Sequence, residues 1–397
     1  MATETPAIAI QLHPPERTLV RTGFLAFYLF SISHFFIDLY SAGLSTFQPL
    51  LGDKLGLNLT QAGILGGLMV FSASVVQPAY GYLSDRYHTR LFSALAPAVA
   101  GIFVSAFGLA PSFAWLLLMV LLGGAGIASF HPQASARATL GLPGNRGRWM
   151  AAFISAGTLG LAVGPTYFST FFTHLGLERS YLAAVPGILI TILLLLLLPD
   201  TAPPAHARSR FDLRPLKAVW KPLTILYFLV FIRSVVQVVY TQFLPLYLHR
   251  ERGFSLPHAS YSLSLYLGAG AIGGFIGGHM ADRFGGRRVI LISMTSCLPV
   301  LALFFLTSGP LSLVGLALSG LALLFTLPVN VVMAQELVPS QAGTVSALMM
   351  GFAWGMAGLI FIPITGWAAD HFTLHYSLAA LAFFPIAGIF LTLKLPK

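Results

Sequence analysis

Charged residues and cysteines are both scarce in this chain. Only 9% of its 397 residues are Asp, Glu, Lys or Arg, whereas 56% are hydrophobic. A soluble globular domain of this length could not bury so much apolar surface, so the composition indicates a membrane protein. The single cysteine, Cys297, excludes a disulfide within the chain and a metal site built from cysteines.

Motifs of enzymes and ATP-driven pumps are also missing. The sequence holds no G-x-S-x-G, H-E-x-x-H, Walker loop or paired-cysteine site. We therefore predict that the protein is not an enzyme and carries neither a cofactor nor a metal ion.

Long uncharged runs dominate what remains. No Asp, Glu, Lys or Arg occurs from Leu91 to Ala136, or from Trp149 to Leu177. Lipid offers no hydrogen-bond partners to the backbone, so such runs must form helices or barrel strands, and they far exceed the roughly 10 residues of a barrel strand. We predict an all-α membrane protein with twelve spans, near 22–51, 58–83, 90–109, 113–136, 149–173, 180–198, 220–248, 257–281, 288–307, 311–334, 341–367 and 373–394.

The spans are expected to form two six-helix bundles. The predicted organisation is a cytoplasmic tail (1–21), a first bundle (22–198), a linker (199–219) and a second bundle (220–397). The linker is assigned from its prolines, basic residues and central position. A short helix at the membrane surface is expected near its end.

The net charge of +10 has an uneven distribution along the chain. If the N-terminus is cytoplasmic, 17 Lys and Arg residues fall in inside segments and four in outside loops, with Arg233 within a helix. The positive-inside rule then predicts that both termini lie in the cytoplasm. Orientation and attraction to anionic lipid explain the basic charge without a nucleic-acid partner.

Two short cassettes, GYLSDRYHTR and GHMADRFGGR, nearly repeat each other 197 positions apart. Such a repeat indicates two similar membrane bundles joined end to end, as in many transporters. Their aspartates can bind neighbouring helix ends, which favours a cytoplasmic gate. The alternative is that their arginines only set the topology. We assign to this gate Gly81, Asp85, Arg86, Arg90, Gly278, Asp282, Arg283 and Arg287, together with Arg137 and Glu336.

Spaced glycines and prolines recur in the fifth and eleventh spans at an offset of 198 residues. Small residues three or four apart let helices approach closely. Each glycine alone could serve plain packing. Because both spans share the set, we interpret it as a sliding contact between the bundles, formed by Gly157, Gly160, Gly164, Pro165, Gly355, Gly358 and Pro363.

The cassette GHMADRFGGRR (278–288) resembles the signature of the major facilitator superfamily, and the run 157–165 resembles a motif of exporters that exchange substrate for protons. Three segments resemble the fosmidomycin resistance protein family more narrowly: SHFFIDLYSAGL (33–44), SFHPQASARA (129–138) and the stretch 334–359. Gln133 departs from the pattern, since glutamate is expected after His-Pro. The resemblance implies a monomeric, two-bundle transporter of a small antibiotic-like molecule in a bacterial inner membrane.

Ionisable residues inside the membrane are functional candidates by default. Asp38 lies 16 residues into the first span, near mid-membrane, and His34 precedes it by one helical turn. Loss of water favours the neutral form of a carboxyl group, so Asp38 with His34 is predicted to load and release a proton. A structural ion pair and a substrate contact without a proton are the alternatives.

Arg233 occupies nearly the position in the seventh span that Asp38 holds in the first. A buried arginine needs an anion, which could be Asp38, an anionic substrate, or each in turn. Gln237 and Tyr240 follow on the same face. His131 is either a satisfied polar group or a residue that handles substrate or protons. We assign substrate binding to Arg233, His131, Gln237, Tyr240 and Asn330.

These features together predict a proton-coupled secondary exporter that works by alternating access. Its expected partners are a small, possibly anionic molecule, protons and the lipid bilayer. Proton-coupled uptake would use the same residues in another order. A membrane receptor without transport is the alternative from a different class.

Overall fold

The computed structural model describes residues 16–87, 89–144, 146–198 and 213–395. Most of the expected tail (1–15) and linker (199–212) lie outside this range. Within it, twelve helical stretches are long and apolar enough to cross a membrane, as the sequence predicts. The all-α fold is therefore confirmed, and the observed spans begin and end close to their expected positions.

The first half of the chain forms six spans, several of them broken. Breaks occur after α1, where α2 continues the first span, and within the second span, where a π-helical segment separates α3 from α4. Short 3-10 helices cover Ala106–Leu109 and Leu177–Ala184. The elements are α1 (Glu16–Ser41), α2 (Gly43–Leu55), α3 (Leu59–Val70), the π segment (Phe71–Val75), α4 (Gln77–Tyr87), α5 (Leu91–Ser105), α6 (Phe113–Arg137), α7 (Arg146–Leu175) and α8 (Val185–Leu197).

The second half repeats this plan after the short helix α9 (Leu213–Ala218), which lies within the expected linker. Its eleventh span also contains a π-helical segment, Ala347–Ala353, preceded by a 3-10 turn at Pro339–Gln341. The remaining elements are α10 (Trp220–Arg250), α11 (Leu256–Phe284), α12 (Gly286–Leu306), α13 (Gly309–Leu324), α14 (Thr326–Leu337), α15 (Ala342–Ser346), α16 (Trp354–His371), α17 (Leu374–Leu381) and α18 (Phe384–Leu393).

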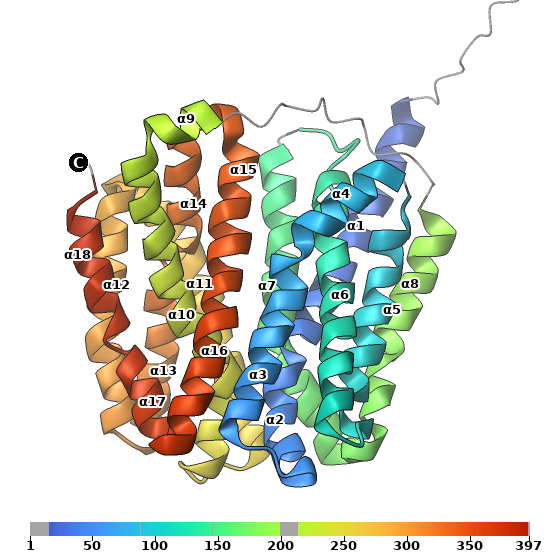
Figure 1. Cartoon of the computed structure of the whole chain (residues 1–397). Helices are drawn as coiled ribbons and strands as arrows, with labels where there is room; N and C mark the ends of the chain where they lie inside the picture. Colours follow the sequence, from blue (N-terminus) through green and yellow to red (C-terminus); the bar gives the residue numbers. More distant parts are fainter. Residues whose placement is uncertain (1–15, 88, 145, 199–212, 396–397) are drawn as a thin grey trace, which may run out of the picture.

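The two halves stand side by side, with α3 and α16 facing each other at the junction (Figure 1). The start of α1, helix α9 and the C-terminal end lie on one face of the molecule, here called the terminal face. Helices α2 and α17 reach the opposite face, here called the far face. Each half also has its own buried core, and Ala62 and Ala162 of the first half pack into the core of the second.

Hydrogen bonds repeat between the halves as the sequence does. The Tyr40 hydroxyl donates to the carbonyl of Ala183 at 3.0 Å, and the Tyr240 hydroxyl donates to that of Leu378 at 3.0 Å. Near the far face, Lys54 Nζ donates to the Gly108 carbonyl at 2.6 Å, and Arg252 Nη2 donates to the Thr307 carbonyl at 2.5 Å. The internal repeat is thus a repeat of tertiary contacts.

The spaced glycines of the fifth and eleventh spans do not form the same kind of contact. A Cβ on Gly160 would lie 1.9 Å from the Phe35 carbonyl oxygen, and one on Gly164 would lie 2.6 Å from that of Leu39. Both neighbours belong to α1, so these glycines pack within the first half. The interpretation as a bundle contact is wrong for them, because this face of α7 is turned inward.

The glycines of the eleventh span do lie between the halves. A Cβ on Gly355 would meet the Val75 side chain at 2.7 Å, and one on Gly358 would meet Val70 at 2.6 Å. Pro363 lies across the same junction from Gly67, and a Cβ on Gly67 would sit 2.8 Å from the Pro363 ring. For these residues the predicted bundle contact is present.

We expect Gly160→Ala to destabilise the fold, because its methyl group would collide with the α1 backbone 1.9 Å away and push α1 and α7 apart. Overpacking of this kind costs about 1–3 kcal/mol. Thermal unfolding of the purified protein in detergent measures the effect. The matched control is Gly268→Ala, a helical glycine with nothing within 4 Å of its missing Cβ. Equal melting temperatures for the two variants would contradict this packing.

Candidate functional site

Three polar side chains meet in the interior of the first half. His34 Nε2 lies 3.4 Å from Asp38 Oδ2, and His131 Nε2 lies 3.6 Å from Asp38 Oδ1. The carboxyl group of α1 is therefore flanked on both oxygens by imidazoles from α1 and α6. The side chains of Asp38 and His131 are 21% and 24% exposed, whereas that of His34 is 9% exposed, so the carboxyl group is not sealed from its surroundings.

The tautomer of His34 follows from its second contact. Its Nδ1 lies 2.8 Å from the Phe153 carbonyl oxygen, which can only accept a hydrogen bond. Nδ1 therefore carries the hydrogen, and the Phe153 ring fixes the imidazole by stacking at a centroid distance of 4.3 Å. In a neutral His34, the Nε2 lone pair would face the lone pairs of an ionised Asp38. The contact is favourable only when a proton resides on one of the two groups.

Gly157 of α7 lies directly over this pair. A Cβ at this position would sit 2.4 Å from His34 Nε2 and 2.5 Å from Asp38 Oδ2. The glycine thus leaves the room in which the carboxyl and imidazole groups meet. The spacing pattern marks Gly157 as a packing residue, but its orientation toward Asp38 requires the helix rotation that only the structure provides.

The same three groups are the described residues that come closest to a metal site. Their ligand atoms all lie within 4.8 Å of one another. Two imidazoles and a carboxylate suit a divalent transition metal, and a hydrogen bond from the outer nitrogen to a carbonyl is common for such ligands. A shared proton satisfies the same geometry, so assays of this site need a chelator control.

Arg233 is separated from this cluster and has only neutral hydrogen-bond partners among the described residues. The side chain is buried, with 4% of the residue exposed; its Nη1 donates to Gln237 Oε1, and its Nη2 donates to Ser234 Oγ at 3.0 Å. Its Nε has no hydrogen-bond partner. Asp38 is therefore not its counter-ion in this conformation.

The other predicted substrate residues divide into two groups. Asn330 is fully buried in α14, and neither its amide nitrogen nor its amide oxygen has a partner. Tyr240 is also buried, but its hydroxyl is bound to the Leu378 carbonyl. This arrangement gives Tyr240 a structural contact, whereas Asn330 keeps its hydrogen-bonding capacity. His131 joins Asp38 rather than Arg233.

The two cassettes pack in equivalent ways. A Cβ on Gly81 would contact Pro132 at 3.5 Å, and one on Gly278 would contact Pro328 at 3.6 Å. In the second cassette, Arg287 Nη2 donates to the Leu393 carbonyl at 2.8 Å, while Asp282 and Arg283 are exposed. These contacts remain within each half. Arg137 is buried and Glu336 is exposed; the side chain of Asp85 lies outside the described part.

Gln133 links three segments of the first half through hydrogen bonds of its buried side chain. Its Oε1 accepts a hydrogen bond from the Ser93 backbone N–H at 2.9 Å, and its Nε2 donates to Ser84 Oγ at 2.7 Å and to the Thr89 carbonyl. The buried amide thus joins α4, the first cassette and the start of α5. A glutamate would lack the two donated bonds, so the departure from the family pattern matches this neutral network.

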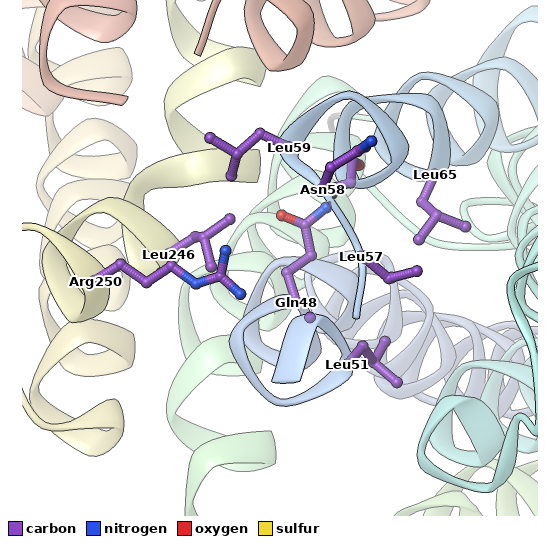
Figure 2. Close-up of a pocket in the computed structure, with 10 residues that line it drawn as sticks. Gln48, Leu51, Leu57, Asn58, Leu59, Leu65, Leu246 and Arg250 are labelled. Atoms are coloured by element: carbon purple, nitrogen blue, oxygen red, sulfur yellow. Dashed lines mark hydrogen bonds between the residues drawn. The ribbon is translucent and has the colours of Figure 1, made fainter. Parts of the chain in front are cut away.

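A small pocket lies near the far face, away from the predicted site. Figure 2 shows Arg250 of α10 extending toward Gln48 of α2 among leucine side chains. The lining consists of the ends of the first, second and seventh spans, namely Gln48, Leu51, Gly52, Leu57, Asn58, Leu59, Ala62, Leu65, Leu246 and Arg250. Arg250 also forms an ion pair with Asp53 at 3.4 Å. The pocket is therefore a space between the halves where they close on the far face.

Two similar halves, each with polar groups at its centre, define the class of two-bundle membrane transporters. The chain belongs to the Major Facilitator Superfamily, whose family model matches residues 30–363 and, in a second match, 258–396.

Individual relatives extend over nearly the whole chain. An uncharacterized MFS-type transporter of Bacillus subtilis (strain 168), YfnC, is 31% identical over 398 residues, covering 96% of both chains. The fosmidomycin resistance protein of Escherichia coli (strain K12) is 28% identical over 390 residues, covering 96% of this chain and 94% of its own. The crystal structure of a bacterial homologue of the human lysosomal transporter Spinster, inward-facing and occupied, shares the fold with a TM-score of 0.79 at 16% identity, covering 96% and 97% of the two chains.

We expect Arg233→Met to leave the melting temperature unchanged or raise it, because the substitution removes a buried cation that has no counter-ion among the described residues. Thermal unfolding in detergent without added ligand is the measurement. The matched control is Arg252→Met, which removes hydrogen bonds to the Thr307 carbonyl and to Ser312 Oγ at 2.5 and 2.8 Å. That variant should lose about 2 kcal/mol. A larger loss for Arg233→Met than for the control would show that the cation is internally compensated.

Proposed function

We propose that this chain is a proton-coupled exporter of small, anionic, antibiotic-like molecules that works by alternating access. The observation that carries the proposal is the Asp38 carboxyl group, which is flanked by the Nε2 atoms of His34 and His131 at 3.4 and 3.6 Å. Because His34 Nδ1 is held by a carbonyl, the contact between His34 and Asp38 is favourable only with a proton on one of these two groups. A partly exposed group that needs a proton for its native geometry is suited to carry one across a membrane.

The proton moves between named atoms in the proposed cycle. Protonated Asp38 donates through one carboxyl oxygen to the free Nε2 of His34. When the proton leaves to the cytoplasm, His34 Nε2 and the ionised Asp38 face each other as two acceptors, and this contact becomes unfavourable. The deprotonated site is therefore stabilised by the binding of a new proton. Substrate binds in the deprotonated, inward-open state, and renewed protonation from the outside accompanies its release.

Arg233, Gln237 and Asn330 are proposed to bind the substrate. They combine a buried cation without a counter-ion and a buried amide without partners, which suits an anion that also accepts and donates hydrogen bonds. The proposal of an antibiotic-like molecule is supported by the relative described as a fosmidomycin resistance protein. The likeness of the run 157–165 to a motif of proton-exchanging exporters supports the direction of transport.

The orientation of the chain in the membrane is proposed from the distribution of its basic residues and from the closed far face. We propose a monomer in a bacterial inner membrane with the terminal face toward the cytoplasm, as the distribution of Lys and Arg suggests. The far face is closed in this conformation: the missing Cβ atoms of Gly63 and Gly366 would lie 2.8 and 2.2 Å from carbonyl oxygens of the opposite half. The cassettes, which pack within their own halves here, are proposed to close the terminal face in the other conformation.

Proteoliposomes with an acidic interior should accumulate external fosmidomycin, because protons leaving through an antiporter drive the drug inward. Asp38→Asn keeps the shape but cannot lose a proton, so accumulation should fall to the level of empty liposomes. Asp53→Asn is the control, since that carboxylate is 70% exposed at the far face.

Reversing the pH gradient in the same vesicles separates the alternatives. Accumulation with an alkaline interior would indicate proton symport, and wild-type transport by Asp38→Asn would exclude Asp38 as the carrier. All buffers contain a chelator, so that a metal ion at the cluster does not contribute.

Gly157→Ala is expected to uncouple transport without unfolding the protein. Its methyl group meets the ends of two side chains, at 2.4 and 2.5 Å, rather than backbone, so His34 and Asp38 can move apart while α1 and α7 stay packed. Drug accumulation driven by the acidic interior should therefore fall while the melting temperature stays near that of wild type. Gly268→Ala should retain both, and full transport by Gly157→Ala would remove Gly157 from the site.

A further inference from the structure

The N-terminus of α3 is capped by residues from both halves of the chain. Asn58 accepts a hydrogen bond from the Gln61 N–H at 2.8 Å, and the Gln61 side chain accepts one from the Asn58 N–H at 3.1 Å. The backbone N–H groups of Leu59 and Thr60, which have no partner within α3, donate to the carboxylate of Asp370 at 2.8 Å each. Asp370 lies at the end of α16, 310 residues from Thr60.

A third bond strengthens this contact. Thr60 Oγ1 donates to Asp370 Oδ2 at 2.5 Å, so the carboxylate accepts three hydrogen bonds from the first turn of α3. Hydrogen bonds to an ionised acceptor are stronger than neutral ones, and a negative charge is favoured at a helix N-terminus. Three N–H groups at the start of α3 thus have side-chain partners, and two of those three depend on the opposite half.

The contact can exist only while the far face is closed. Next to it, a Cβ on Gly366 would lie 2.2 Å from the Leu59 carbonyl oxygen, which shows that α3 and α16 touch at the level of their backbones. Separation of the halves at this face withdraws Asp370 from α3. The N–H groups of Leu59 and Thr60 then lose their protein partner and are left to water.

We propose that Asp370 is the lock of the far-face gate: it serves as a helix cap for α3 from the opposite half and thereby stabilises the closed state. The other charged contact there is weaker, since the Asp53–Arg250 pair is at 3.4 Å with Asp53 70% exposed. The inference rests on the alternating-access part of the proposed function and is independent of the substrate and the proton.

A single introduced cysteine reports on the gate. The native Cys297 is fully buried, and Ala62 of α3 is 6% exposed and packs into the core of the second half, so Ala62→Cys provides the reactive thiol. The rate of its modification by a membrane-impermeant maleimide is measured on the full chain in nanodiscs, without drug or pH gradient. Asp370→Asn removes the negative charge and replaces one acceptor oxygen with an NH2 group that cannot accept, so it weakens the cap and is expected to raise this rate about fivefold.

Two further variants make the test specific. Thr60→Val removes only the hydroxyl bond and should give a smaller rise, which keeps the proposal testable if Asp370→Asn fails to yield folded protein. Asp53→Asn is the matched control and should label at the parent rate. An unchanged rate in folded Asp370→Asn, or an equal rise in Asp53→Asn, overturns the lock. Because no transport is measured, failure of fosmidomycin accumulation would leave this result standing.

Discussion

Hydrocarbon offers no hydrogen bonds, and this constraint limits where polar groups can lie within the membrane spans. Backbone groups are satisfied by helices, and many side-chain hydroxyls donate to backbone carbonyls, as in the repeated Tyr40 and Tyr240 contacts. The exceptions are therefore informative. Three groups stand out: a carboxyl group beside two imidazoles, an arginine with neutral partners and an asparagine with no partner. Such groups are costly in an apolar interior, and ionisable ones inside a membrane are functional candidates by default.

The two halves repeat in architecture but differ in their polar centres. The first half gathers an acid and two histidines on α1 and α6, while the second half holds Arg233 on α10, which has no acidic partner among the described residues. In the proposed cycle the proton and the substrate consequently use different bundles. Coupling must then pass through the relative movement of the halves rather than through direct competition for one site. The junction of α3 and α16, where both spans contain π-helical segments, is placed to transmit that movement.

Much of the fold could be predicted from the sequence because hydropathy acts locally. Uncharged runs predict the spans to within a few residues, and the repeated cassettes predict two similar halves. The pairing of His34 with Asp38 was also accessible, since residues four apart share a helix face. The position of His131 beside Asp38 was not, because the packing angle between α1 and α6 has no signature in the spacing.

The spaced glycines also show that the sequence does not reveal which helices pack together. Equal spacing in the fifth and eleventh spans predicts close helix contacts, but the partner helix depends on the rotation of each span about its axis. That rotation turns Gly160 toward α1 within the first half and Gly358 toward α3 across the junction. The link from Asp370 to Thr60 was equally hidden, since it joins two loop-proximal residues 310 positions apart.

The bare backbone of Gly157 over Asp38 has a mechanical consequence. Successive residues of a helix are offset by about 100° around its axis, so a turn of α7 by one position would bring Ala156 or Thr158 to the place of the glycine. The carboxyl group would then face a methyl or a hydroxyl in place of open space. The same turn would bring Leu159 or Leu161 to the place of Gly160, where a Cβ would already lie 1.9 Å from the Phe35 carbonyl oxygen. The glycines of span five therefore fix its rotation against span one, and this rotation keeps the space beside Asp38 and His34 open.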